Sequence, residues 1–172
     1  PGLGQSAWSK AIYSKVIQTN LNLVVDADAL NLLAKDPIQN KNWILTPHPG
    51  EASRLLDCQV SDVQKDRFLA VKNLQKKYGG VIVLKGCGSL ICVSQDEPIL
   101  VCSEGNPGMA TAGMGDVLTG VIVALLAQKL SLKDAACLGV ILHARAGDRA
   151  ANKGERGLLA SDLFEELRGL VN

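Results

Sequence analysis

The sequence predicts an α/β fold of three layers, in which a mainly parallel β-sheet is flanked by helices. Short apolar runs rich in Val and Ile alternate along the chain with longer helical segments, which is the pattern of βα units. The 172 residues are 47% hydrophobic and 20% charged, so we expect one domain over residues 1–172 with a sizeable core. Because aromatic residues make up only 3%, Val, Leu, Ile and Ala must build that core.

The first half of the chain predicts two strand–helix units and then a long helix. The predicted strands cover residues 21–26 and 43–46, and the predicted helices cover 29–34, 51–56 and 61–78. The long helix is amphipathic, with apolar residues at helical spacing among Lys, Gln and Asp. Gly79 and Gly80 should end it.

The second half predicts three strands and three helices. The strands cover residues 81–84, 89–93 and 99–102, and the helices cover 112–129, 132–153 and a last segment that runs from Ser161 or Asp162 to Leu170. The helix over 112–129 is apolar on nearly every side, so we expect it to be central and buried.

Charge, apolar runs and cysteines exclude several classes of protein. Eighteen basic against 17 acidic residues give a net charge of +1, which disfavours nucleic acid as the main partner. The longest apolar run, residues 117–127, is shorter than the ~20 residues that span a bilayer, so no membrane partner is expected. The five cysteines include no C-x-x-C pair and predict reduced thiols in the cytoplasm.

The segment Asn106–Asp116 is the richest in chemistry, because Gly113 and Gly115 lead directly into the apolar helix. Glycines let backbone N–H groups approach a ligand, and a helix N-terminus favours an anion such as a phosphoryl group. A carboxylate at an anion site repels the anion, so its presence indicates another role. Asp116 fits a general base that takes a proton from an attacking hydroxyl. The alternative is that Asp116 caps the helix and the glycines permit close packing.

The segment Thr46–Glu51 places His48 and Glu51 in a proline-rich loop after a strand. His48 fits the binding of a polar substrate, and Glu51 fits the holding of a metal-bound water. The structural alternative makes His48 a loop residue and lets Glu51 offset the dipole of the next helix.

Three other features also allow a chemical and a structural interpretation. The segment Lys85–Ser89 suits either a nucleotide loop or a hairpin turn, and its spacing excludes a Walker A loop. Asp26 and Asp28 suit a metal pair or, as we favour, a helix cap. His143 lies among small residues in a helix and is predicted to be a core histidine with its hydrogen bonds satisfied.

Taken in order, several of these segments are similar to those of the ADP-dependent NAD(P)H-hydrate dehydratase family. The segments that carry the resemblance are Pro1–Gly4, Val25–Asn31, Thr46–Glu51, Lys85–Ser89 and Asn106–Gly120. The likeness continues to Gly157–Asp162 and so covers essentially the whole chain. It implies a ribokinase-like fold, in which His48 to Glu51 resembles the N-x-x-E motif of the kinases with His for Asn.

The resemblance also implies a reaction and a set of site residues. ADP would phosphorylate the hydroxyl of NADHX or NADPHX, and loss of phosphate would restore NADH or NADPH. Asp116 would be the base, and Gly4, His48 and Asp116 would face the hydrate. The adenine nucleotide would contact Lys85, Gly86, Cys87, Gly88, Ser89 and Gly115, with Gly113 beside the transferred phosphoryl, and Glu51 would organise Mg²⁺ through water.

Two rival functions and several partners follow from the same resemblance. An ATP-dependent kinase for a vitamin precursor or sugar would use the same glycines and Asp116, and a nucleotide-binding module without turnover is the other alternative. Family domains usually carry further strands and a helix before the Pro1–Gly4 segment, so we expect the start of the domain to be absent here. The expected partners are the hydrate, ADP, further copies of the chain, and an NAD(P)HX epimerase that is fused or separate.

Overall fold

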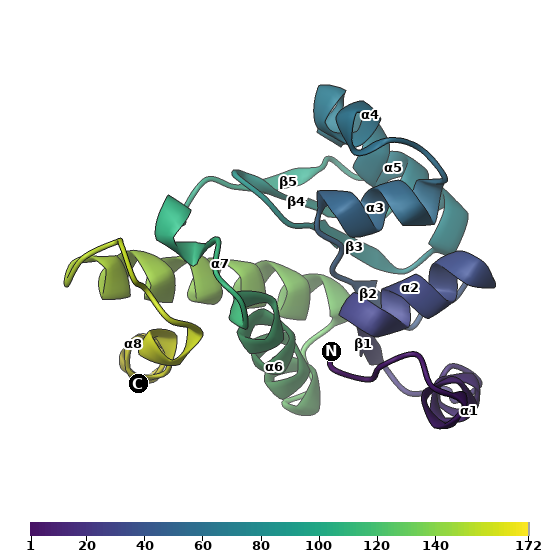
Figure 1. The fold of residues 1–172 in the computed structure, drawn as a ribbon, viewed down its shortest axis with the longest axis horizontal. Helices are drawn as coiled ribbons and strands as arrows, with labels where there is room; N and C mark the ends of the chain where they lie inside the picture. The colour runs from purple at the N-terminus through teal and green to yellow at the C-terminus, as the bar shows by residue number, and fades with distance from the viewer. Residues whose placement is uncertain (172) are drawn as a thin grey trace.

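The computed structural model describes residues 1–171 and shows a five-stranded sheet between two layers of helices (Figure 1). The strands are β1 (Leu23–Val25), β2 (Trp43–Leu45), β3 (Val81–Leu84), β4 (Ser89–Cys92) and β5 (Leu100–Cys102). The helices are α1 (Ala7–Val16), α2 (Ala27–Lys35), α3 (Pro49–Leu56), α4 (Val60–Lys65), α5 (Arg67–Tyr78), α6 (Met114–Ala127), α7 (Leu132–Ala151) and α8 (Leu163–Leu170), with 3₁₀ turns at Pro107–Met109 and Ala160–Asp162. None of the helices described has the length and apolar character that crossing a bilayer requires.

The sheet has the order β1-β2-β3-β4-β5 and is mixed. Strands β1, β2 and β3 pair in parallel, with Val24 beside Ile44 and Leu45 beside Ile82. Strands β4 and β5 continue the sheet in antiparallel pairs. The three-layer α/β fold is therefore confirmed, whereas parallel pairing is confined to the half of the sheet that holds β1–β3. The carboxyl ends of those three strands meet at one edge, which is where ligands bind in α/β sheets.

Alternate side chains of the strands pack into two separate cores. Leu45, Ile82 and Leu84 face the layer formed by α2, α3 and α5. Ile44 and Val83 face α6 and α7 on the opposite side. Figure 1 shows α3, α4 and α5 gathered on one side of the sheet and α7 running along the other, with α8 packed on α7.

The single helix predicted over residues 61–78 is in fact two helices that meet at Asp66. The backbone of Asp66 leaves the helical region at φ −145° and ψ 85°, and its carboxylate accepts the Leu69 N–H at 2.8 Å. Asp at an N-cap competes with a continuing helix because it satisfies a free backbone donor. The prediction was wrong at this point, and the break places Arg67 at the first position of α5.

The prediction that the helix near residues 112–129 is buried all round was also wrong. Helix α6 buries Leu118, Ile122 and Leu125 against the sheet and α7, but Val123 is 48% exposed. The apolar composition is spread around the helix, whereas the residues described pack against one side of it. Composition alone therefore overestimated its burial.

Helix α1 was not predicted from the sequence. It buries Tyr13 in the first core but leaves Trp8, Ile12 and Val16 exposed, at intervals of four residues on one face. Only one side of this helix therefore contributes to the core described here.

His143 in α7 is a core histidine, as the sequence predicted. Its Nε2 lies 2.9 Å from the carbonyl oxygen of Met114, the first residue of α6, so the neutral ring can donate a hydrogen bond there. Burial lowers the pKa of His143 to about 4 from its usual 6.5, with a smaller contribution in the same direction from the Lys85 charge. His143 thus ties the start of α6 to α7 in an uncharged state.

This depressed pKa predicts a loss of stability in mild acid. The unfolded chain takes up a proton near pH 6.5 and the folded chain only near pH 4, so stability falls as the pH drops through that window, by at most about 3 kcal/mol. His143→Gln keeps a donor for the Met114 carbonyl but does not titrate. Urea unfolding at pH 7 and pH 4.5 should show a smaller loss for the variant; parallel losses in both proteins would contradict the prediction.

Candidate functional site

A cluster of charged side chains lies where β1, β2 and β3 end. The Lys85 ammonium, after β3, is 2.8 Å from a carboxylate oxygen of Asp26 after β1 and 3.8 Å from one of Glu51 in α3. The carboxylates of Asp26 and Glu51 are 3% and 6% exposed, and the Lys85 side chain is 19% exposed. Two carboxylates and one ammonium sum to −1 at this edge of the sheet.

Asp26 is therefore a site residue and not the helix cap that we favoured. It occupies the N-cap position of α2, but its side chain accepts no capping hydrogen bond. Its second oxygen accepts a hydrogen bond from the Thr119 hydroxyl at 3.3 Å, which ties the cluster to α6. The Asp26 carboxylate therefore forms an ion pair with Lys85 and does not cap α2.

Asp26 and Asp28 also do not act as the metal pair that was the other interpretation. The Asp28 carboxylate accepts the N–H of Gly4 at 2.8 Å, whereas Asp26 binds Lys85. Between them Ala27 has a left-handed φ of +49°, a conformation that a residue with a Cβ adopts only at a cost of order 1–3 kcal/mol. This backbone directs the two carboxylates to different partners and brings the Gly4 segment to the same edge of the sheet.

His48 and Glu51 have a structural role that does not use all of their polar atoms. His48 is the N-cap of α3, and its Nδ1 accepts the Gly50 N–H at 3.0 Å, while Glu51 accepts the His48 N–H at 2.8 Å. Because Nδ1 is the acceptor, the proton of the neutral ring is on Nε2, which is 3.5 Å from Glu51. The His48 side chain is 51% exposed, so Nε2 is available to a ligand.

The segment Lys85–Ser89 is the turn between the antiparallel strands β3 and β4. Gly86 and Gly88 have left-handed φ angles of +146° and +67°, and the Ser89 hydroxyl bonds back to the Gly86 carbonyl at 3.3 Å. Cys87 is exposed at the tip, and all five cysteines have free thiols. The turn interpretation is thus correct for the backbone, and a ligand can still contact the exposed tip.

The start of α6 lies directly beside the charged cluster. Gly113 is its N-cap with φ +88° and has no side chain to cap the first-turn N–H groups. A Cβ on Gly115 would lie 3.3 Å from the Lys85 ammonium and 3.4 Å from Asp26, so a larger residue would press on the ion pair. Such an uncapped N-terminus attracts anions.

Asp116 lies in the first turn of α6, one residue beyond Gly115, and is exposed. It is not the N-cap, which is Gly113, so the capping alternative is wrong. No ion pair or side-chain hydrogen bond among residues 1–171 engages its carboxylate. An exposed acid without a partner, next to uncapped N–H groups, is accessible to a ligand bound at this end of α6.

The residues present fit a magnesium ion brought by a nucleotide better than one held by the protein alone. Within the described chain no group of three or more His, Cys, Asp or Glu side chains is arranged to hold a metal. The Lys85 ammonium already lies between Asp26 and Glu51. Since Mg²⁺ keeps several waters and binds through few carboxylates together with phosphates, Glu51 fits contact through water.

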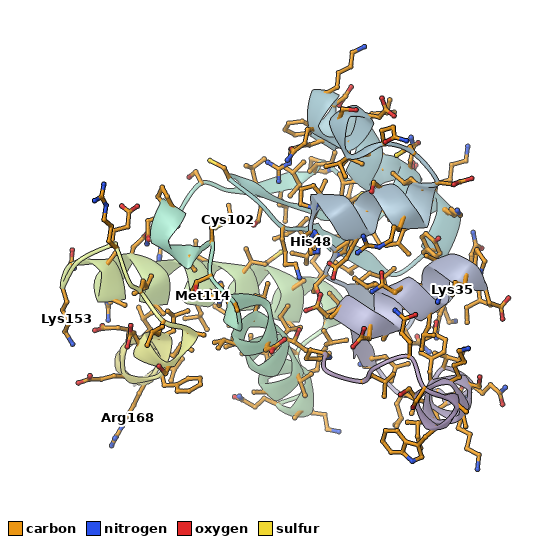
Figure 2. The ribbon with its side chains drawn as sticks, viewed as in Figure 1. Lys35, His48, Cys102, Met114, Lys153 and Arg168 are labelled. Carbon is orange, nitrogen blue, oxygen red and sulfur yellow. The ribbon has the colours of Figure 1, made fainter. Side chains whose placement is uncertain are left out.

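The structure thus brings together most of the residues singled out in the sequence, and adds Thr119. Lys85 and Gly115 meet directly, with Glu51 beside Lys85 and His48 on Glu51. Figure 2 shows His48 at the start of α3 and Met114 at the start of α6, both toward the middle of the molecule. Thr119 lies 93 positions from Asp26 on another element, so no local signal in the sequence pointed to it.

Comparison with known proteins agrees with this geometry. A model of the family described as NAD(P)H-hydrate dehydratase matches residues 1–168. The bifunctional NAD(P)H-hydrate repair enzyme Nnr of Coxiella burnetii is 59% identical over 100% of this chain and 35% of its own length. The ADP-dependent (S)-NAD(P)H-hydrate dehydratase of Neisseria meningitidis is 42% identical over 99% of this chain and 60% of its own. The chain therefore spans about a third of the bifunctional relative and 60% of the other.

Solved structures show the same likeness in the fold. The ADP/ATP-dependent NAD(P)H-hydrate dehydratase of Bacillus subtilis, co-crystallised with ATP and Mg²⁺, matches with a TM-score of 0.88 at 31% identity over 99% of this chain and 61% of that one. A ribokinase-like superfamily protein of Enterococcus faecalis matches with a TM-score of 0.84 at 28% identity over 99% of this chain and 60% of that one. Fold and site together define a ribokinase-like protein. Within that class, the chain belongs to the NAD(P)H-hydrate dehydratase family, whose model matches nearly all of it.

The Asp26–Lys85 pair should stabilise the site and the fold together. Asp26→Asn leaves the half-buried ammonium without its closest anion, and we expect a loss of about 2–3 kcal/mol in the free energy of unfolding. The double variant with Lys85→Met should lose less than the sum of the single variants. Glu97→Gln in the exposed pair with Lys133 is the control and should cost less than about 1 kcal/mol in urea unfolding.

Proposed function

We propose that this chain carries the ADP-dependent dehydration of hydrated NADH or NADPH, (6S)-NADHX or NADPHX, back to NADH or NADPH. The observation that carries the proposal is the unpaired, exposed Asp116 carboxylate beside the uncapped N-terminus of α6, in a chain of the dehydratase family. In the proposed reaction the hydroxyl of the hydrate attacks the β-phosphoryl of ADP and releases AMP. Phosphate then leaves with restoration of the ring double bond, so the products are NADH or NADPH, AMP and phosphate.

Each part of the site has a role in this proposal. Asp116 takes the proton from the attacking hydroxyl, and the N–H groups around Gly113 and Gly115 stabilise the phosphoryl as it moves. The turn Lys85–Ser89 receives the adenine nucleotide. Gly4 and His48 face the hydrate, for which the half-exposed ring of His48 supports a hydrogen-bonding role.

The charge of the site supports a need for bound cations. The cluster of Asp26, Glu51 and Lys85 sums to −1, and Asp116 adds a further carboxylate, whereas ADP is an anion. Mg²⁺ held on the phosphates, with Glu51 contacting it through water, would supply neutralising charge. The protein's own contribution is the row of N–H groups at α6 and the orientation of the two substrates.

The proposal extends to the organisation of the whole protein. Residues 1–172 are proposed to belong to one ribokinase-like domain that works in the cytoplasm, as its unpaired cysteines suggest. The bifunctional relatives, of which this chain matches about a third, support an NAD(P)HX epimerase as a fused or separate partner. Homo-oligomerisation is also proposed.

A single reaction distinguishes this proposal from the two rival functions. ADP and Mg²⁺ are added to NADHX and the return of NADH absorbance is followed, with AMP and phosphate measured as co-products. We expect turnover with ADP to exceed turnover with ATP, because ATP needs room and charge for one further phosphate. A stable phosphorylated product from ATP and a vitamin or sugar alcohol, without release of NADH, would support a kinase; nucleotide binding without any product would support a binding module.

Asp116→Asn tests the assignment of the base. The change keeps the size of the side chain but removes its basicity, so turnover should fall by about 10²–10⁴-fold while ADP affinity stays near that of the unaltered protein. Stopped assays of NADH release measure the first quantity and calorimetry measures the second. Turnover within a few-fold of the unaltered protein would show that Asp116 is not the base.

A further inference from the structure

The side chain of Arg67 lies under the turn between β3 and β4 and binds its backbone. Its guanidinium donates from Nη1 to the Cys87 carbonyl and from Nη2 to the carbonyls of Leu84 and Lys85, at 3.3 and 3.5 Å for the latter two. One side chain from α5 therefore holds three carbonyl oxygens within four consecutive residues of the turn. A guanidinium suits this task because its planar fork presents several donors at fixed angles.

The turn is shaped to receive this guanidinium. Gly86 has φ +146°, and a Cβ at this position would lie 2.9 Å from Nη2 of Arg67. The absence of a side chain on Gly86 thus lets the backbone lie on the guanidinium. Arg67 reaches this place because the chain breaks at Asp66, so that Arg67 begins α5.

Arg67 also differs from Lys85 in the use of its charge. Lys85 is paired with Asp26 and lies near Glu51, whereas no carboxylate of residues 1–171 forms an ion pair with Arg67. Its Nε is buried without a hydrogen-bond partner, so the group is held by the turn carbonyls alone. The result is a guanidinium fixed on the backbone of a turn whose first residue, Lys85, belongs to the charged cluster.

We propose that Arg67 is a positioning residue for nucleotide binding, which fixes the Leu84–Cys87 backbone in the form that accepts a nucleoside diphosphate. The inference rests on the proposed function in taking this turn as the nucleotide site. Arg67 acts through the turn by fixing the orientation of its backbone N–H groups. Its removal should therefore weaken the nucleotide complex far more than it slows the chemical step.

Arg67→Met tests this role, because it keeps an unbranched stem as far as the position of Nε and removes every donor and the charge. We expect the Kd and KM for ADP to rise by about 10–100-fold, the worth of lost charge-assisted hydrogen bonds, with kcat at saturating ADP changed by less than about threefold. Amide hydrogen exchange in peptides that cover Lys85–Gly88 should become faster. Arg67→Lys keeps the charge but loses the planar fork of donors, so its ADP affinity should lie between that of the unaltered protein and that of Arg67→Met.

Arg54→Met is the matched control. Arg54 lies in the last turn of α3 and donates to Asn31 of α2, so this variant should leave both the ADP affinity and the hydrogen exchange of the turn unchanged. Unchanged exchange of the turn in Arg67→Met, or unchanged ADP affinity, would overturn the inference. Equal losses in kcat and affinity would also overturn it, because they would indicate general damage. If Arg67→Met does not fold, Arg67→Lys decides by the same measurements.

The proposed function and this inference fail in different ways. Absence of ADP binding to the unaltered protein would contradict the proposed function. The exchange of the turn would still decide whether Arg67 fixes its backbone, because that measurement needs no nucleotide. Normal ADP binding with an unaffected Arg67→Met variant would contradict the inference and leave the proposed function intact.

Discussion

The ion pair between Lys85 and Asp26 is the contact on which the site depends. It joins the ends of β1 and β3 at 2.8 Å, and Thr119 extends it to α6. Because a buried charge without a partner is costly, loss of either partner should destabilise this edge of the sheet. Gly115 passes within van der Waals reach of the pair, so the N-terminus of α6 is placed against it. The ion pair therefore sets the position of the uncapped N–H groups that precede Asp116.

The balance of charge at this edge explains the arrangement of the remaining groups. Lys85 satisfies Asp26 and cannot also serve as a free cation, so an anionic nucleotide needs positive charge from elsewhere. In the proposed nucleotide complex, the dipole of α6 would be the contribution of the protein and Mg²⁺ that of the nucleotide. Asp116 differs from the buried acids because it is exposed and unpaired. One site thus contains buried acids that hold structure and an exposed acid to which the proposed function assigns the proton transfer.

Several features of this site could be predicted from sequence because their signals are local. The apolar run Val81–Leu84, the glycines that end a helix at Tyr78 and the glycines before α6 all have the expected structure. His143 was predicted correctly because small neighbours in a helix indicate a packed position. The break at Asp66 was not predicted and Asp26 was interpreted wrongly for the same reason: an aspartate can cap a helix or pair with a distant charge, and local sequence does not distinguish the two.

The sequence by itself determined the five strands and most of the helices along the chain, the family resemblance and the glycine-rich segment before Asp116, because periodicity and motif spacing are properties of neighbouring residues. It did not reveal α1 or the break at Asp66. Only the tertiary structure decided which charges meet. Asp26 and Lys85 are 59 positions apart along the chain. Arg67 contacts Cys87, 20 positions away, and it lies at a helix start that the helical pattern of the sequence did not reveal. Contacts of this kind depend on strand order and on the exact start of α5, and helical or strand periodicity carries no information about either.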